Sequence, residues 1–215
     1  MKSRKRSFVL FTMLGALLLF IVLTIFVVTE STPVGRFNAA LYAPIAGFIT
    51  PALTAAATWI GHLTHWYTYA PIILLLLLIP RTRWRIGLPV AITVSVSAIL
   101  GPLILKNIFA VERPNVNPLI DPGGFGYPSG HSMNAMVFFG ICAVMILRYA
   151  GRKPLKICFT IFAVLAILLV GLSRIYLGVH TVTDVLGGYL AGLVVLSAAV
   201  LAEHRFHREV SHGSA

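Results

Sequence analysis

Residues 127–147, YPSGHSMNAMVFFGICAVMIL, join a polar turn directly to a long apolar run. The turn carries a proline, a glycine, two serines and a histidine. The run that follows predicts a helix over residues 129–149, and about 20 residues are enough to cross a bilayer. A single histidine, His131, is therefore expected at the tip of a membrane helix. Its presence there needs an explanation other than apolar packing.

The composition of the whole chain agrees with a membrane protein. Of 215 residues, 58% are hydrophobic and only 11% are charged, whereas soluble domains devote about a quarter of their residues to charge. No alternating pattern typical of a β-barrel is present, so the spanning elements are expected to be helices. We predict an all-α fold, with one membrane domain over residues 1–202 and a loose polar cytoplasmic tail over residues 203–215.

Six apolar segments are expected to span the membrane, at about 8–29, 63–80, 86–109, 129–149, 154–172 and 182–202. Between the first two, residues 37–66 are expected to form short amphipathic helices on the outer surface. We expect an interfacial aromatic belt there, made of Trp59, Trp66, Tyr67 and Tyr69. Two histidines in this segment, His62 and His65, either touch a substrate or simply line a wet interface.

The net charge of +11 is distributed as expected for cytoplasmic loops. The basic residues cluster before the first expected span, after the second, between the fourth and fifth, and after the last. These clusters contain Lys2, Arg4, Lys5, Arg6, Arg81, Arg83, Arg85, Arg148, Arg152, Lys153, Lys156, Arg205 and Arg208. Both termini are therefore predicted to be cytoplasmic, and the basicity indicates topology rather than a nucleic-acid partner.

A first polar group falls at the outer end of the third expected span, in KNIFAVERP. Lys106 and Arg113 are seven residues apart, nearly two helical turns, so both can project to one face. Pro114 disfavours helix at the preceding residue, which places Arg113 at or beyond the helix end. Such cations either serve a ligand or snorkel to the membrane surface.

The second group is the turn before the fourth span. If a helix begins at Ser129, the backbone N–H groups of Ser129, Gly130 and His131 have no helical partners. We expect them to point outward as an anion site, aided by the helix dipole. Gly130 permits close approach of a ligand to the backbone, and the Ser129 hydroxyl can add a donor. The alternative is an ordinary serine N-cap.

The third group, SRIYLGVHTVTD, connects the fifth and sixth spans and contains Arg174, His180 and Asp184. A carboxylate four residues after a histidine can accept the N–H of one imidazole nitrogen. The other nitrogen then keeps its lone pair for nucleophilic attack. The alternative is a His–Asp pair that only holds a helix start together.

Taken together, the three groups place three cations, two histidines, an anion-binding turn and one carboxylate on the same membrane face. Charge in a membrane protein is costly and is by default a sign of function. A site rich in cations and poor in carboxylates suits an anion with several oxygens, and phosphate fits best.

These residues resemble the three signature motifs of the type 2 phosphatidic acid phosphatase superfamily. The motifs are Lys106-x6-Arg113-Pro114, residues 128–131, and Ser173-Arg174-x5-His180-x3-Asp184. The resemblance implies that His180 is a nucleophile forming a phosphohistidine, that Asp184 orients it, and that His131 is the general acid and then the base. It further implies that the phosphoryl oxygens are held, without metal or cofactor, by Lys106, Arg113, Ser129, Gly130 and Arg174.

The resulting expectation is a metal-independent integral membrane phosphatase. Its substrate would be a lipid phosphate or polyprenyl pyrophosphate of the phosphatidylglycerophosphate, phosphatidate or undecaprenyl pyrophosphate type. It would act on the periplasmic or extracellular face of the cytoplasmic membrane, with the lipid bilayer and its substrate as partners, and no nucleic acid or obligate protein partner. The alternatives are a lipid phosphotransferase with the same site, or a non-enzymatic anion or lipid transporter. A transporter predicts inverted repeats, and we find none.

Overall fold

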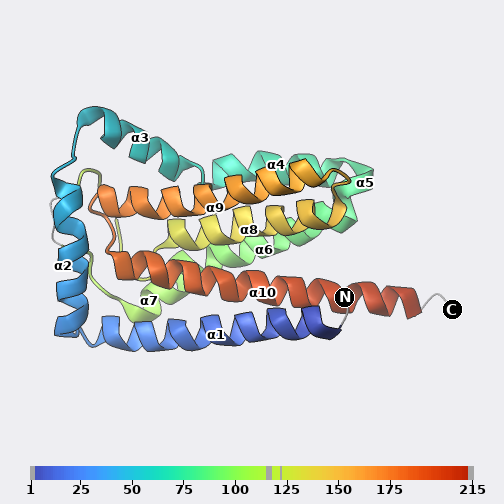
Figure 1. Cartoon of the computed structure of the whole chain (residues 1–215), viewed down its shortest axis with the longest axis horizontal. Coiled ribbons are helices and arrows are strands. Elements are labelled where there is room, and N and C mark those ends of the chain that lie inside the picture. The colour runs from blue at the N-terminus through green and yellow to red at the C-terminus, as the bar shows by residue number, and fades with distance from the viewer. Residues whose placement is uncertain (1–2, 115–117, 122, 213–215) are drawn as a thin grey trace.

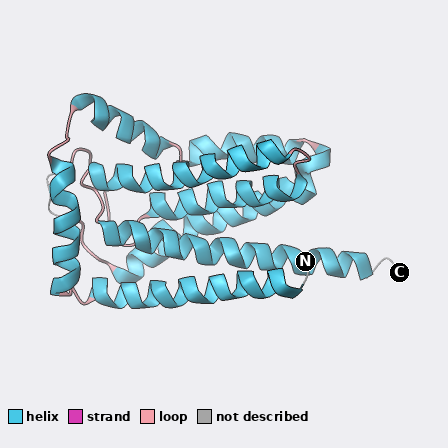
Figure 2. Ribbon diagram, viewed as in Figure 1, coloured by secondary structure: helices cyan, strands magenta, loops and turns pink. Residues whose placement is uncertain are grey.

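The computed structural model describes residues 3–114, 118–121 and 123–212, and its regular elements are all helical (Figure 2). In chain order the elements are α1 (Ser3–Val28), α2 (Thr32–Ala46), α3 (Pro51–His62), α4 (Trp66–Leu78), α5 (Pro80–Thr82), η1 (Arg83–Gly87), α6 (Leu88–Ile99), η2 (Leu100–Leu105), α7 (Lys106–Phe109), α8 (Gly130–Tyr149), α9 (Lys153–Tyr176) and α10 (Val182–His212). The segments η1 and η2 have π-helical hydrogen bonding and join α5, α6 and α7 into one helical stretch.

Five helical stretches among the described residues are long and apolar enough to cross a membrane. They are Arg4–Val28, Pro80–Phe109, Gly130–Tyr149, Lys153–Tyr176 and Val182–Glu203. The chain is therefore a multi-span membrane protein. The expected span at 63–80 corresponds to α4, which has only 13 residues. At 1.5 Å per residue it reaches ~20 Å, short of a ~30 Å hydrocarbon core.

Several predicted boundaries differ from the observed ones, and two of the differences are large. The third span begins at Pro80 instead of residue 86, so its basic residues Arg81 and Arg83 lie in the helical stretch rather than in a loop. The last helix continues to His212, so the expected loose tail is helical over residues 203–212. An ion pair between Arg148 of α8 and Glu203 fastens the first part of this extension to the bundle. Lys2 and residues 213–215 lie outside the described residues.

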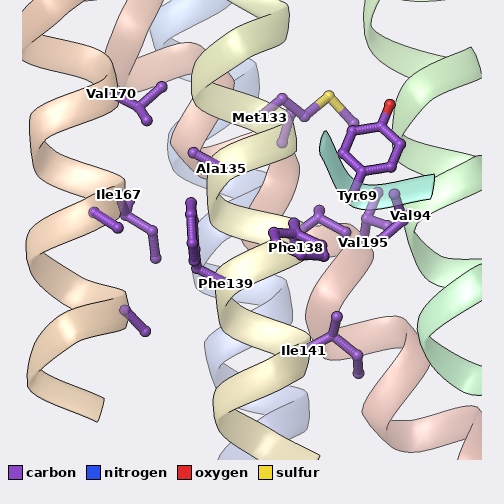
Figure 3. Packing of buried hydrophobic residues seen from close by; sticks show 14 of the residues in the cluster. Tyr69, Val94, Met133, Ala135, Phe138, Phe139, Ile141, Ile167, Val170 and Val195 are labelled. Atoms are coloured by element: carbon purple, nitrogen blue, oxygen red, sulfur yellow. The ribbon is translucent and has the colours of Figure 1, made fainter. Parts of the chain in front are cut away.

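The expected short helices between the first two spans are present as α2 and α3. In Figure 1, α2 lies across one end of the bundle, nearly perpendicular to the long helices. The expected aromatic belt is only partly right. Trp59 and Trp66 are 71% and 68% exposed, but Tyr69 is buried and its ring lies 5.8 Å from that of Phe138. Tyr69 points into the bundle, where its ring lies near Phe138 of α8 (Figure 3).

Helix α8 lies in the middle of the apolar core, with α6, α9 and α10 around it (Figure 3). It approaches α10 closely because Gly188 and Gly192 present no side chain to it. A Cβ at Gly192 would lie 2.9 Å from the Met133 carbonyl oxygen, closer than ordinary contact. Small residues at this spacing let membrane helices pack backbone to backbone.

The topology separates the two ends of the bundle. The start of α1, the α8–α9 turn and the end of α10 lie at one end (Figure 1). At the other end lie α2, the start of α8 and the α9–α10 connection. The second and third polar groups identified in the sequence are therefore brought to the same end as α2.

Candidate active site

A cavity of about 740 Å³ opens where the three polar groups meet. Six of the eight predicted site residues line it: Lys106, Arg113, Gly130, His131, Arg174 and His180. The other two, Ser129 and Asp184, are buried and stand behind this lining. Residues separated by up to 74 positions in the chain thus face one common space.

The imidazole of His180 lies between a carboxylate and a guanidinium. Its Nδ1 is 3.5 Å from Oδ2 of Asp184, longer than an ordinary hydrogen bond, and it has no hydrogen-bond partner among the described residues. The same oxygen accepts a 2.7 Å hydrogen bond from the backbone N–H of Thr181. On the other side, Nε2 is 3.4 Å from Nη1 of Arg113. Catalytic hydrogen bonds are often long before substrate binds, so this geometry suits an Nδ1–H tautomer with the Nε2 lone pair toward the cavity.

Burial keeps this imidazole neutral. His180 is only 3% exposed, and burial lowers its pKa to about 4, with Lys106 and Arg113 acting in the same direction and Asp184 opposing them. Because only the neutral ring has a free lone pair, the environment of His180 favours a nucleophile over an acid.

Backbone carbonyl groups hold the two cations of the first motif. The Nζ of Lys106 donates to the Phe125 carbonyl at 2.7 Å. The guanidinium of Arg113 donates to the carbonyls of Gly123 at 2.7 Å and Val179 at 2.6 Å. Gly123 has φ +51°, a left-handed conformation that glycine adopts without strain. Ala110 ends α7, so Arg113 lies beyond the helix end, in agreement with the expectation from Pro114.

The turn before α8 differs in one respect from the prediction. The N–H of Ser129 is not available to a ligand, because it donates to the Asp184 carbonyl at 3.0 Å. The Ser129 hydroxyl caps α8 by accepting from the N–H of Ser132 at 3.4 Å. This backbone hydrogen bond links the start of α8 to α10, the helix that carries Asp184. Because the Ser129 N–H is used in it, the N–H groups left for a ligand are those of Gly130 and His131.

Arg174 lies in the last turn of α9, which extends beyond the predicted end at residue 172. Its Nε donates to the Ser173 hydroxyl at 3.1 Å, and its Nη2 donates to the Ala57 carbonyl of α3 at 2.9 Å. The guanidinium passes directly over Gly61, where an added Cβ would overlap it. Gly61 is therefore a determinant of where Arg174 points.

Substituting Gly61 with alanine is expected to displace the Arg174 guanidinium and lower kcat/KM. Removing one donor to the transition-state oxygens costs about 10²–10³-fold, so a displaced donor should cost about tenfold to a hundredfold. The thermal midpoint should change little, since the end of a flexible side chain can move. Steady-state rates in detergent check this, with Gly35→Ala as control because nothing lies within 4 Å of a Cβ there. Unchanged kinetics in Gly61→Ala would show that the position of Arg174 is unimportant.

Sequence reasoning missed several supporting residues. Thr181 caps α10, since its hydroxyl accepts the Asp184 N–H at 3.1 Å while Asp184 accepts the Thr181 N–H. This reciprocal pair is a capping box, and the Thr-x-x-Asp spacing was a readable signal for it. Asn38 of α2 donates to the Thr183 hydroxyl at 2.9 Å. No local pattern indicates the partnership of Asn38, because it depends on how α2 folds over the bundle end.

The donor set of the cavity suits an anion. Among the described residues, no group of three or more His, Cys, Asp or Glu side chains is placed to hold a metal ion. The cations and backbone donors instead converge on a space that fits a phosphoryl group, with one imidazole flanked by a carboxylate and a second imidazole on the cavity wall.

Comparisons with known proteins agree with this geometry. A family model described as the PAP2 superfamily matches residues 86–208. The chain is 35% identical to phosphatidylglycerophosphatase B of Bacillus subtilis over 67% of its own length and 72% of that protein. It is 32% identical to undecaprenyl-diphosphatase of Sulfolobus acidocaldarius over 82% of its length and 84% of that protein. A crystal structure of a transmembrane PAP2 type phosphatidylglycerolphosphate phosphatase from Bacillus subtilis superposes with a TM-score of 0.82, at 28% identity, covering 91% of this chain and 97% of the other.

Proposed function

Because this chain belongs to the PAP2 superfamily of lipid phosphatases, we propose that it hydrolyses a membrane lipid phosphate or polyprenyl pyrophosphate through a phosphohistidine on His180. The observation that supports this proposal is the convergence of Lys106, Arg113, Arg174 and both histidines on one cavity. Substrates of the phosphatidylglycerophosphate, phosphatidate and undecaprenyl pyrophosphate types all offer the phosphate that this cavity suits.

In the first step, Nε2 of His180 attacks phosphorus. The N–P bond forms while the P–O bond to the leaving group breaks, and the proton carried by His131 moves to the leaving oxygen. Charge on the equatorial oxygens is stabilised by Lys106, Arg113 and Arg174 and by the N–H groups at the start of α8. The Ser129 hydroxyl is proposed to assist from behind Gly130.

In the second step, His131 accepts a proton from water as the water oxygen attacks phosphorus. The N–P bond breaks, inorganic phosphate is released, and His180 returns to its neutral form. Asp184 holds the imidazole through Nδ1 in both steps and stabilises its cationic phosphorylated form. Both histidines end in the protonation states in which they began, so the cycle is balanced without a metal or cofactor.

The proposed topology places the cavity on the periplasmic or extracellular side of a cytoplasmic membrane. It counts α4 as a sixth, shortened span, which puts both termini on the cytoplasmic side. The basic clusters at the opposite end of the bundle support this orientation. A lipid phosphate would then meet the cavity at headgroup depth while its tails stay in the bilayer.

The test is phosphate release by purified protein in detergent with excess EDTA, using phosphatidylglycerophosphate, phosphatidate, lysophosphatidate and undecaprenyl pyrophosphate. Release should persist after chelation for at least one of these substrates. Product analysis with added lipid alcohols separates hydrolysis from phosphoryl transfer. Loss of activity on chelation, restored by a divalent cation, would contradict the metal-independent mechanism.

The rate should depend on pH in a bell shape whose acidic limb is unusually low. His180 is nucleophilic only when neutral, and its pKa is lowered to about 4, so activity should fall about tenfold for each pH unit below that value. An ordinary histidine, with a pKa of about 6.5, would already be mostly protonated, and so not nucleophilic, at about pH 5. The alkaline limb comes from loss of the proton that His131 must donate.

The pH dependence of diethyl pyrocarbonate labelling at His180, read by mass spectrometry, separates this titration from that of the substrate. If the labelling rate of His180 fell to half at about pH 6.5 instead of about pH 4, His180 would not be shielded from water as the fold implies.

A further inference from the structure

The connection between α3 and α4 brings a third histidine to the cavity. The ring of His65 lies 5.2 Å from that of His131, at an interplanar angle of 76°. This is an edge-to-face arrangement of the kind that aromatic side chains favour. His65 lies outside the residues matched by the family model and outside all three motifs.

Few specific contacts hold the imidazole of His131. Unlike His180, it makes no hydrogen bond to any described residue, and its ring contact with His65 is the only aromatic contact it has among them. A general acid must nevertheless be held within reach of the leaving oxygen. Something other than a hydrogen bond to the protein therefore has to set the orientation of this ring.

His65 is itself firmly placed. Its ring stacks on Tyr67 at 5.0 Å with an interplanar angle of 9°, and His62 contacts it edge-on at 5.6 Å. Its carbonyl accepts the N–H of Thr68 at 3.0 Å as α4 begins. One turn further along α4, Tyr69 docks against Phe138 of α8 (Figure 3). Residues 65–69 therefore contact α8 at two points, His131 through His65 and Phe138 through Tyr69.

The charge state of His65 allows it to sit beside a proton donor. Burial lowers the pKa of His65, and the nearby His62 and Arg174 act in the same direction. A neutral imidazole can pack against a neighbouring imidazole without like-charge repulsion.

From this geometry we propose that His65 is a positioning residue for His131, acting through ring packing to aim the general acid at the leaving oxygen. The proposal rests on the function proposed above and adds a role for the segment between the first two spans. In this proposal His131 contacts the substrate, and His65 supports His131 without contacting the substrate itself. If His65 only lined a wet interface, its loss would not affect proton donation selectively.

The test is a double-mutant cycle of His65→Ala and His131→Ala, measured as single-turnover release of the leaving group in detergent. The two substrates are dodecyl phosphate, whose alkoxide needs a proton, and 4-nitrophenyl phosphate, whose phenolate does not. We expect His65→Ala to slow the first about tenfold and the second less than about twofold, because misplacing a catalytic group by ~1 Å can cost up to 10²-fold. The double variant should be no slower than His131→Ala alone, since the two residues act as a unit.

Matched variants separate this role from simple destabilisation. His62→Ala removes the edge-on contact with His65 but keeps the ring contact between His65 and His131, so it should change the ratio of the two rates less than His65→Ala does. His65→Phe keeps a flat ring and should recover most of the lost rate. Should His65→Ala not fold, His65→Gln, which lacks a ring, replaces it in the cycle.

Multiplicative losses in the double variant, or equal losses on both substrates, would overturn the role of His65. These outcomes are distinct from failure of the proposed function. An inactive wild type, or a His180→Asn variant that keeps full activity, would overturn the function itself.

Discussion

Replacing His180 with alanine is expected to lower phosphate release by at least about 10⁴-fold, because loss of a nucleophile from a cooperating unit removes the covalent route altogether. The imidazole is buried between Asp184 and Arg113, so no water can take its place with the same alignment. The neighbouring imidazole of His131 is proposed to donate a proton and cannot supply a second nucleophile at the same position.

The covalent step gives this prediction a sharper readout than rate alone. Brief incubation with substrate labelled in its phosphate should yield an acid-labile, base-stable phosphoprotein in the wild type and none in His180→Ala. In His131→Ala, with a 4-nitrophenyl leaving group, the label should accumulate, because the first step needs no acid while the second still needs a base.

Two controls keep the interpretation secure. His180→Asn retains a hydrogen-bond donor near Asp184 but has no nucleophilic nitrogen, so it should fold like the wild type and remain inactive. Label recovered in either His180 variant, or more than about one per cent of the wild-type rate, would mean that another residue attacks phosphorus.

The second large effect is expected at Gly188, where α10 crosses the start of α8. A Cβ there would overlap the Ser129 carbonyl oxygen and lie 2.9 Å from the Ser132 Cβ. Backbone cannot move aside as a side-chain end can, so Gly188→Ala should force the two helices apart. Overpacking of this kind costs about 1–3 kcal/mol and occasionally more.

Activity should fall further than stability, because the same displacement separates the N–H groups of Gly130 and His131 from His180. The thermal midpoint in detergent and kcat on a lipid phosphate measure the two effects. Gly15→Ala in α1 is the matched control, since nothing lies within 4 Å of a Cβ at that glycine. If Gly188→Ala were as stable and active as Gly15→Ala, the close approach of α8 and α10 would not be needed for the site.

The helix ends that carry the three motifs are signalled more clearly in the sequence than the packing of the helices around them. Each motif lies at a helix end, and such ends are signalled locally. Pro114 follows the third span, Ser129 precedes Gly130 as an N-cap, and Thr181 begins a capping box. Predicted ends at residues 109 and 149 and the predicted start at residue 182 agree with α7, α8 and α10.

What the sequence could not predict depends on how helices pack. Tyr69 is aromatic and near an expected interface, yet it is buried because its ring reaches Phe138 of α8. The N–H of Ser129 is used by the Asp184 carbonyl, a contact between residues 55 positions apart. The polar stretch after residue 202 was expected to be loose, but α10 continues through it. Gly61 carries no local signal of its closeness to Arg174.

The fastening of Lys106 and Arg113 to backbone carbonyls has a consequence for turnover. Carbonyl groups fix the two side chains in place without cancelling their charge, so the cavity is already shaped and charged for a tetrahedral oxyanion before one arrives. Inorganic phosphate, the last product, matches that shape as well as the substrate does. Release of phosphate can therefore limit the rate of turnover as much as the chemical steps do. For the same reason, free phosphate or vanadate should inhibit the enzyme and raise its melting temperature.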